Sequence, residues 1–286
     1  MTIALDPASV ASVTPTASPW PKGTRAVCLL TYDVDVDESF MARKMLEPIM
    51  LSIGQFEPTV AVPGILQMLR DYGIKTTFFV PGSVAKRFTP MVDAMLKDGH
   101  EIGHHGYHHE AGTFFTSRQQ ELDTFARGIE ALEKITGKKP VGYRSPMWEF
   151  SSNTVSVLEE LGFSYTSDRM DDLLPKYHVL GGRQSGLLDL PVHWVLDDMA
   201  HFNYHSQMKV RIRSCEEVLQ IYKEEFAGIY AYGGMFMLTM HPQASGRPSR
   251  LLMMRAFLEY VKSFPGVWIA SPSELVAYWK KAYPPA

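Results

Sequence analysis

The sequence predicts an α/β protein, a single-domain distorted (β/α) barrel with about seven parallel strands. Three observations lead to this fold class. The chain has 286 residues, and one α/β barrel needs about 250. A helical stretch, a glycine and an apolar β-like run follow one another repeatedly along the chain, as parallel strands with helical crossovers require. No linker long enough to separate two domains interrupts this pattern.

The repeated pattern places the elements in order. In "ILQMLRDYGIKTTFFVPG" the helical stretch ends at Gly73, and a β-branched and aromatic run follows it. Gly99, Gly137 and Gly162 repeat this arrangement, because glycine takes the left-handed conformation that ends a helix without strain. Besides the strands after those glycines, we expect strands at 26–34, 74–80, 187–192, 235–240 and 267–270. Helices are expected at 40–51, 117–136, 214–230, 250–264 and 272–281, whereas 170–215 shows no clear periodicity.

Composition and charge exclude several classes of function. A net charge of −3 without a Lys/Arg-rich run argues against nucleic acid as a partner. Residues 1–24 form a Pro/Ser/Thr-rich N-terminal arm that lacks the features of a secretory signal, and 25–286 form the catalytic domain. No apolar stretch approaches the ~18 residues of a membrane span, and two cysteines predict no disulfide framework. We therefore expect a cytoplasmic protein with no membrane partner.

Polar side chains follow several of the expected strands. The carboxyl ends of parallel strands meet at one edge of the sheet, where ligands bind. The residues at these ends are carboxylates, histidines, a serine and one arginine: Asp33, Asp35, His105 to His109, Arg144, Ser167, Asp168, His193, Asp197, Asp198 and His241. This set of side chains is typical of a metal-assisted active site.

The segment "HEIGHHGYHHE" allows two different metal sites. His100 to His104 matches the H-E-x-x-H pattern of zinc proteases, which requires a helix. Gly99 and Gly103 argue for a strand instead, and a strand would separate these histidines by about 13 Å, too far for one zinc ion. His104 and His108 are then best explained as residues of a solvated loop.

The second possible pair is His105 and His109, which lie four positions apart where the chain turns at Gly106. The aspartates of "TYDVDVD" are the obvious donors of a third ligand. Two imidazoles and one carboxylate leave positions open for water and substrate, as in catalytic sites. We expect one divalent metal ion, zinc as the first choice, with nickel, cobalt or manganese as alternatives. Asp37 could replace Asp33 or Asp35.

Four separated motifs, "LLTYDVDVD", "HEIGHHGYHH", "GYRSPMW" and "LTMHP", resemble those of the polysaccharide deacetylases in the same order, across residues 25 to 275. These are carbohydrate esterases with a chitooligosaccharide-deacetylase-like domain. The wording "HGYHHE", "GYRSPMWEFS", "LPVHWVLDD" and "HPQASGRPSR" resembles the intracellular branch of cyclic imide hydrolases and allantoinase-like proteins. The resemblance implies a barrel of the deacetylase type.

The resemblance also implies roles for individual residues. It makes Asp33 the catalytic base, Arg144 the residue that holds this base, and His241 the acid. Asp35, His105 and His109 would hold the metal. Val34 separates the two aspartates, which are adjacent in secreted deacetylases, and Thr166 stands where related sequences tend to have an aspartate. The resemblance leaves Asp168 and Asp172 as the candidates to substitute for this aspartate, on which the tuning of His241 depends.

The expected reaction is hydrolysis of a carbon–nitrogen bond other than a peptide bond, in a small cyclic amide or imide. The alternatives are a deacetylase of N-acetylated sugars or peptidoglycan, and a binding module without catalysis. We expect Met147, Trp148, Trp194 and Asp198 to contact the substrate, with a backbone N–H near Met147 or Trp148 stabilising negative charge. Phe202 and Tyr204 would complete an aromatic wall, or these aromatics would form the interface of a homo-oligomer.

Overall fold

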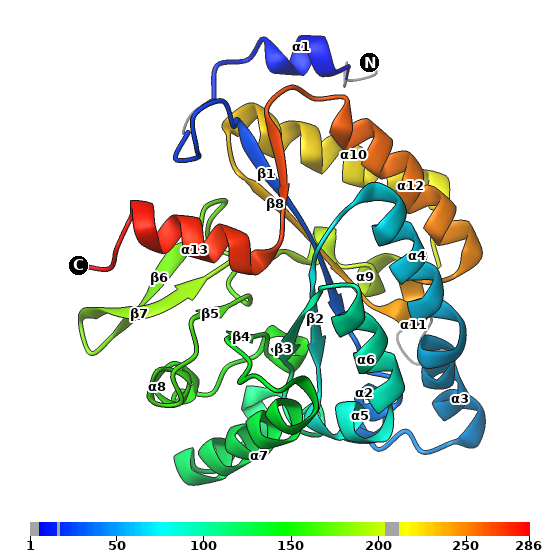
Figure 1. Cartoon of the computed structure of the whole chain (residues 1–286), viewed down its shortest axis with the longest axis vertical. Helices are drawn as coiled ribbons and strands as arrows, with labels where there is room; N and C mark the ends of the chain where they lie inside the picture. Colours follow the sequence, from blue (N-terminus) through cyan, green and yellow to red (C-terminus); the bar gives the residue numbers. More distant parts are fainter. Residues whose placement is uncertain (1–5, 16–17, 204–211) are drawn as a thin grey trace.

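A mostly parallel nine-stranded sheet organises the computed structural model, which describes residues 6–15, 18–203 and 212–286. The strands are β1 (Ala26–Asp33), β2 (Thr77–Val80), β3 (Glu101–His104), β4 (Gly142–Tyr143), β5 (Tyr165–Thr166), β6 (Lys176–Leu180), β7 (Arg183–Asp189), β8 (Met235–Met240) and β9 (Val267–Ala270). Their order is β6-β7-β5-β4-β3-β2-β1-β8, and β9 pairs with β1. Figure 1 shows β1 and β8 side by side at the centre.

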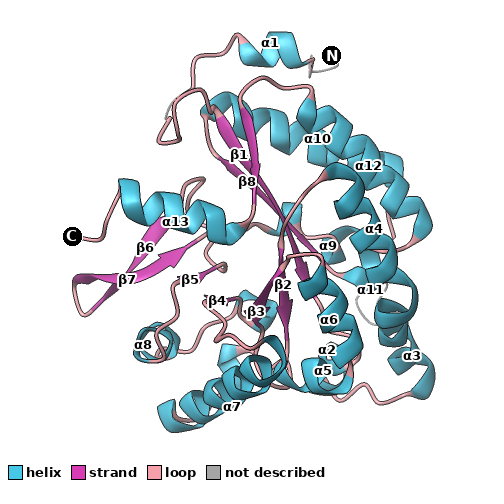
Figure 2. Cartoon of the chain, viewed as in Figure 1, coloured by secondary structure: helices cyan, strands magenta, loops and turns pink. Residues whose placement is uncertain are grey.

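Helices cover the outside of this sheet (Figure 2). They are α1 (Pro7–Ala11), α2 (Glu38–Ala42), α3 (Pro48–Phe56), α4 (Val62–Tyr72), α5 (Gly82–Arg87), α6 (Thr89–Lys97), α7 (Arg118–Thr136), α8 (Thr154–Glu160), α9 (Met199–Phe202), α10 (Cys215–Tyr232), α11 (Pro242–Ser245), α12 (Pro248–Lys262) and α13 (Pro272–Ala282). Short irregular turns are η1 (Glu57–Ala61), η2 (Gly112–Phe114), η3 (Pro146–Trp148) and η4 (Trp194–Leu196).

The predicted fold class is confirmed in an open form. Seven strands, from β7 through β8 along the sheet, run parallel to their neighbours, β9 lies parallel to β1, and only β6 pairs antiparallel. The described strands do not close on themselves, so the barrel is distorted and open. All eight residues of β1 are buried, as expected for a strand with neighbours on both edges. This strand delivers Asp33 to the centre of the molecule.

Several predicted elements are present with the expected ends. Gly73 ends α4 with φ 66° and Gly137 ends α7 with φ 70°, both in the left-handed conformation that favours glycine. The helix expected at 40–51 is wrong as one unit, because α2 ends at Ala42 and α3 begins at Pro48. Proline lacks the N–H that a helix interior needs but fits the first turn of a helix. The chain therefore breaks before Pro48.

Residues 170–215, which show no clear periodicity in the sequence, contain a β-hairpin that was not predicted. Strands β6 and β7 pair antiparallel around Gly181 and Gly182, both at positive φ. Such a two-residue turn is the common connection of a β-hairpin. The strand expected at 187–192 therefore begins earlier, at Arg183, and ends at Asp189.

One helical stretch contradicts the expectation that no apolar segment is long enough to cross a membrane. Elements α3, η1 and α4 form one run of 25 residues, Pro48–Tyr72, which is long and apolar enough by length and composition alone. Core helices pass the same test. Ile65, Met68 and Leu69 of this run are buried in the main hydrophobic cluster.

Arg25 is one of the residues that join the N-terminal segment to the domain, together with Pro19 and Trp20. Arg25 donates hydrogen bonds to the backbone oxygens of Ala11, at 2.5 Å, and Tyr230, at 3.2 Å. Its guanidinium also lies 4.5 Å from the centre of the Tyr230 ring. The division into an arm at 1–24 and a catalytic domain at 25–286 stays a prediction.

Candidate active site

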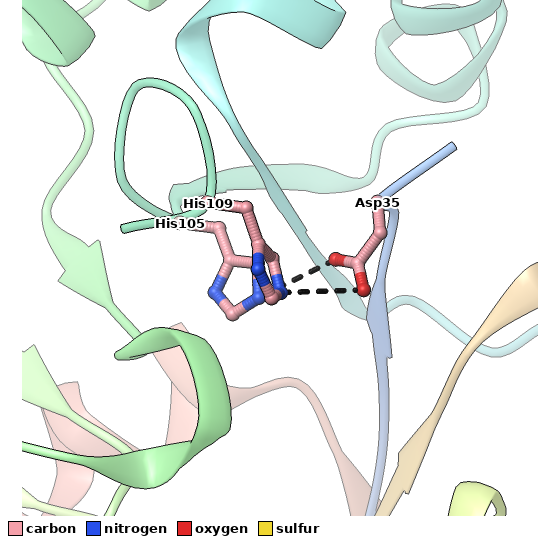
Figure 3. A group of neighbouring side chains, drawn as sticks. All are labelled: Asp35, His105 and His109. Carbon is pink, nitrogen blue, oxygen red and sulfur yellow. Dashed lines mark ion pairs between the residues drawn. The ribbon is translucent and has the colours of Figure 1, made fainter. Parts of the chain in front are cut away.

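Asp35, His105 and His109 converge at the carboxyl ends of β1 and β3 (Figure 3). His105 Nε2 lies 3.5 Å from Asp35 Oδ1, and His109 Nε2 lies 3.4 Å from Asp35 Oδ2. The three side chains are buried, and one ligand atom from each lies within 4.8 Å of the others. Two imidazole nitrogens and a carboxylate oxygen at this spacing form a donor set that can hold a divalent ion.

The surroundings of these side chains fit a metal ion. Asp35 Oδ1 is buried and has no hydrogen-bond partner in the described part of the chain, which is costly unless the atom has another ligand. His105 Nδ1 lies 2.7 Å from the backbone oxygen of Arg144, an arrangement that fixes the ring and leaves Nε2 as the ligand atom. Burial lowers the pKa of His105, although the charges of Asp33 and Asp35 act to raise it. The imidazole is therefore favoured in the neutral form that binds metals.

A tight turn brings the two imidazoles to the same carboxylate, Asp35. Gly106 at φ 75° and His109 at φ 59° reverse the chain after β3. Glu110 closes the turn by accepting the backbone N–H groups of Tyr107, at 2.9 Å, and His108, at 2.8 Å. His105 and His109, four positions apart, therefore point to the same place although the segment between them is not a regular helix.

His100 and His104 do not form a metal site. Both belong to the β3 region, where His104 is the last residue of an extended strand. His104 is fully buried, and its Nε2 lies 3.2 Å from the backbone oxygen of Phe125. The zinc-protease interpretation is therefore excluded. The expectation of a solvated loop is wrong for His104, while His108 is half exposed and lies 3.2 Å from Glu38.

Asp33 is held by Arg144 as expected. Arg144 Nη1 donates to Asp33 Oδ1 at 2.7 Å and to Thr31 at 2.9 Å, and Nη2 donates to the Ser167 hydroxyl at 2.7 Å. The arginine is fully buried, and its guanidinium lies 4.4 Å from the centre of the Phe79 ring. The arginine is therefore an internal anchor for the carboxylate, whose second oxygen lies 3.9 Å from His105 Nε2. An ordinary surface ion pair is excluded.

His241 follows β8 and is oriented by Asp198. Its Nδ1 lies 2.8 Å from Asp198 Oδ1, and its backbone N–H donates to Asp198 Oδ2 at 2.9 Å. Asp197 lies further from Nδ1, at 3.8 Å. Burial alone would lower the pKa of His241, but the hydrogen bond with Asp198 and the nearby carboxylates raise it well above its usual range. The ring is thus favoured as an imidazolium with Nε2 left for a substrate.

The carboxylate beside His241 differs from the ones expected. Asp168 accepts the backbone N–H of Ser145 at 2.7 Å and so supports the loop after Arg144. Asp172 accepts the N–H of its neighbour Leu173 and has a partly exposed side chain. Neither substitutes for the missing aspartate near Thr166, because Asp198 already occupies the position next to His241. Asp37, the other alternative, pairs with Arg87.

Asp198 does not line the cavity, so the expectation that it contacts the substrate is wrong. Its side chain is fully buried, and it also accepts a hydrogen bond from the Ser245 hydroxyl at 2.5 Å. The neighbouring Asp197 lines the cavity instead. Burial raises the pKa of Asp197 to about 7. The charge of His241 acts to lower this pKa, and the charge of Asp198 acts to raise it further. A parallel bridge between Asp197 and Thr239 of β8 places both aspartates beside His241.

The cavity over these residues has a volume of about 110 Å³. Met147, Trp148 and Trp194 line it as expected, and the two indole rings lie 4.5 Å apart. Met147 and Trp148 have φ near 59° and 55°, a left-handed conformation that costs energy for such side chains and is found at functional sites. The lining residues that the sequence reading missed are Ser39, Phe40, Arg43, Met199, Asn203 and Gln243.

Two other expectations for the wall have different outcomes. Phe202 is buried and packs 4.1 Å from the Arg250 guanidinium, so it does not belong to the lining. Tyr204 lies outside the described residues. Of the two backbone N–H groups expected to stabilise negative charge, that of Trp148 donates to Ser145 at 3.0 Å.

The same fold is found in a candidate polysaccharide deacetylase from Mycobacterium smegmatis, which is 34% identical to this chain with a TM-score of 0.84. The match covers 96% of this chain and 98% of the other. The chain belongs to the polysaccharide deacetylase family. The family's sequence pattern, described as polysaccharide deacetylase, matches residues 49–166. Members of this family are hydrolases that act on carbon–nitrogen bonds.

Further relatives point to more than one substrate class. The peptidoglycan deacetylase of Helicobacter pylori is 29% identical over 274 residues, which cover 84% of this chain and 92% of that protein. The PuuE allantoinase shares the fold with a TM-score of 0.82 and 23% identity, over the whole of both chains. The chain therefore shares its fold with proteins whose names indicate different substrates.

Proposed function

We propose that this polysaccharide deacetylase family member is a metal-dependent hydrolase of a small cyclic amide or imide. The observation that carries the proposal is the joint arrangement of three groups around one small cavity. These are the Asp35–His105–His109 donor set, the Asp33–Arg144 pair, and the His241–Asp198 pair. A binding module would need no base and acid in the same cavity as a metal site.

A divalent ion held by Asp35, His105 and His109 would polarise a substrate carbonyl and make a water molecule more acidic. Asp33 is the base, because Arg144 occupies its Oδ1 and leaves Oδ2 to accept a proton from the attacking water. Arg144 also fixes the direction of the carboxylate. Because the site is buried, the attraction between Arg144 and Asp33 is stronger than in bulk water, and so would be the attraction between the ion and the substrate carbonyl.

His241 supplies a proton to the departing nitrogen, which is otherwise a poor leaving group. Asp198 occupies Nδ1, so the proton is delivered from Nε2. The carboxylates around the ring favour its charged form before the reaction. The acid therefore begins with the proton that hydrolysis of an amide requires.

The size and walls of the cavity favour a small, flat substrate. A cavity of about 110 Å³ that is lined on one side by two touching indole rings accommodates a single five- or six-membered ring better than an extended glycan. The full-length structural match with PuuE allantoinase, whose name indicates a cyclic ureide, supports this choice. The Helicobacter pylori relative supports the second candidate, deacetylation of an N-acetylated sugar or peptidoglycan.

The deciding experiment is a parallel assay of the metal-loaded protein. Metal analysis of the purified protein comes first, followed by reconstitution with zinc, nickel, cobalt or manganese. Succinimide, dihydrouracil, allantoin and an N-acetylglucosamine oligomer are then compared at equal enzyme concentration. Turnover of a cyclic compound alone supports the proposal, and release of acetate from the oligomer alone favours the second candidate. The cytoplasmic location and the homo-oligomeric state stay predictions.

A further inference from the structure

The segment from Gly54 to Ala61 lies against both loops that carry the candidate chemistry. At one end, Gly54 packs so tightly on the backbone of Val36 that a Cβ atom at this glycine would collide with it. Gln55 Nε2 donates to Asp37 at 3.4 Å in the same loop. These contacts join the segment to the loop after β1, which carries Asp35.

The other end of the segment contacts the loop after β8, which carries His241. Gly246 packs on Ala61, again too closely for a Cβ atom. The guanidinium of Arg247 lies 5.4 Å from the centre of the Phe56 ring. The segment therefore connects the Asp35 loop with the His241 loop, and Figure 1 shows α3 and α4 on the same side of the molecule as α11.

Glu57 lies in the middle of this segment and has an unusual environment. It is fully buried, and among the described residues neither carboxylate oxygen has a hydrogen-bond partner that meets normal geometry. It begins η1, a π-helical turn between α3 and α4, and single π-turns inside helices are frequent at functional sites. A buried carboxylate without partners is costly, so its presence needs an explanation.

The Glu57 carboxylate faces the backbone N–H groups of Val36 and Gln243. Burial and the charge of Asp35 raise the pKa of Glu57 well above its usual range, while the backbone N–H groups of Val36 and Gln243 act in the opposite direction. These two N–H groups are therefore close to the carboxylate, although not at full hydrogen-bond geometry. One belongs to the residue after Asp35, and the other lies two residues after His241.

The Asp35 loop also needs such support. Val36 has φ 52°, and a β-branched residue in the left-handed region is strained unless its surroundings hold it there. Val36 is fully buried under the segment. This strained residue directly follows Asp35, whose carboxylate lies beside the two imidazoles.

We propose that Glu57 is a positioning residue that braces the loop of Asp35 against the loop of His241 through the backbone N–H groups of Val36 and Gln243. Glu57 contacts neither substrate nor metal in this arrangement. It keeps Asp35, the candidate metal ligand, and His241, the candidate acid, at a fixed separation in the cavity. The inference rests on the proposed function for its effect on turnover, but the brace itself is a property of the fold.

The test compares Glu57→Ala and Glu57→Gln with Leu258→Ala, a matched control that truncates a fully buried side chain of α12. Deuterium exchange is measured by mass spectrometry for peptides containing Val36 and Gln243, in protein without added metal. Faster exchange in both peptides is expected for Glu57→Ala, with a smaller change for Glu57→Gln, because glutamine keeps the size of the side chain and an oxygen that faces the same two N–H groups. The control is expected to leave both peptides unchanged.

Zinc affinity is the second measurement. Loss of an outer-shell support typically weakens metal binding by about 10-fold to 100-fold, and we expect a loss in this range for Glu57→Ala but none for Leu258→Ala. Unchanged exchange in both Glu57 variants overturns the brace, whether or not the protein binds zinc. If Glu57→Ala does not fold, the same exchange comparison for Glu57→Gln decides. Absence of zinc binding in the unmodified protein counts against the proposed function instead.

Discussion

The Nδ1 atom of His241 and the Oδ1 atom of Asp198 lie 2.8 Å apart in the buried floor of the cavity. Asp198 also accepts the backbone N–H of the same histidine, at 2.9 Å. The carboxylate therefore fixes the direction of the imidazole ring and stabilises its charged form, in the way that a buried carboxylate orients a catalytic histidine. The role of His241 as an acid depends on this pair.

Asp198→Asn is expected to lower kcat by about 10²-fold, because a positioned acid contributes 10²–10⁴-fold to the rate. The histidine must carry a proton to act, so activity falls as the pH rises through its pKa. Removal of the Asp198 charge lowers that pKa. The alkaline limb of the pH profile of kcat/KM should therefore move to lower pH. An alkaline limb at an unchanged position would contradict the assignment of His241 as the acid.

Asp35→Ala and Asp33→Asn are expected to separate metal binding from proton transfer. Asp35 is the carboxylate of the donor set, so its removal should abolish both metal content and activity. Asp33 is directed by Arg144, so its amide variant should keep the metal but lose turnover by about 10²–10⁴-fold. Metal content by atomic spectroscopy and kcat are measured on the same samples. Equal metal content in the two variants would overturn these roles.

Arg144→Met is expected to destabilise the fold, since it leaves the buried Asp33 carboxylate without its cation. Breaking a buried pair in this way typically costs about 3–5 kcal/mol. Arg118→Ala is the matched control, because the Arg118–Glu160 pair is exposed on both sides and such pairs contribute about 0–1 kcal/mol. Urea denaturation gives both free energies of unfolding. A loss for Arg144→Met as small as that of the control would show that Asp33 has another stabilising partner.

Most of the candidate site follows from local sequence rules. Asp33 ends the apolar strand β1 and Asp35 closely follows it, whereas His105 and Arg144 directly follow the short strands β3 and β4. The carboxyl ends of parallel strands meet at one edge, so these side chains converge once the strands are placed. The turn at Gly106 accounts for the spacing of His105 and His109.

Asp198 could not be assigned in the same way. Its position beside His241 depends on a bridge between Asp197 and Thr239, residues far apart in the chain. The region before it has no periodicity, and its hairpin turns on the adjacent Gly181 and Gly182. This pair of glycines was the available signal for β6 and β7. A long-range contact of this kind leaves no comparable mark in the local sequence.

Gly128→Ala and Gly228→Ala are expected to change stability in opposite directions, although both glycines lie inside long helices. A Cβ atom at Gly128 of α7 would overlap the buried His104 ring, and such overpacking typically costs about 1–3 kcal/mol. Gly228 of α10 has no heavy atom within 4 Å of a built Cβ, so alanine should stabilise the helix by about 0.5–1 kcal/mol. Thermal and urea denaturation measure both changes. Because His104 is a packing residue and no metal ligand, zinc affinity should be unchanged in folded Gly128→Ala. A gain in stability for Gly128→Ala equal to that of Gly228→Ala would contradict the tight packing of α7 on His104.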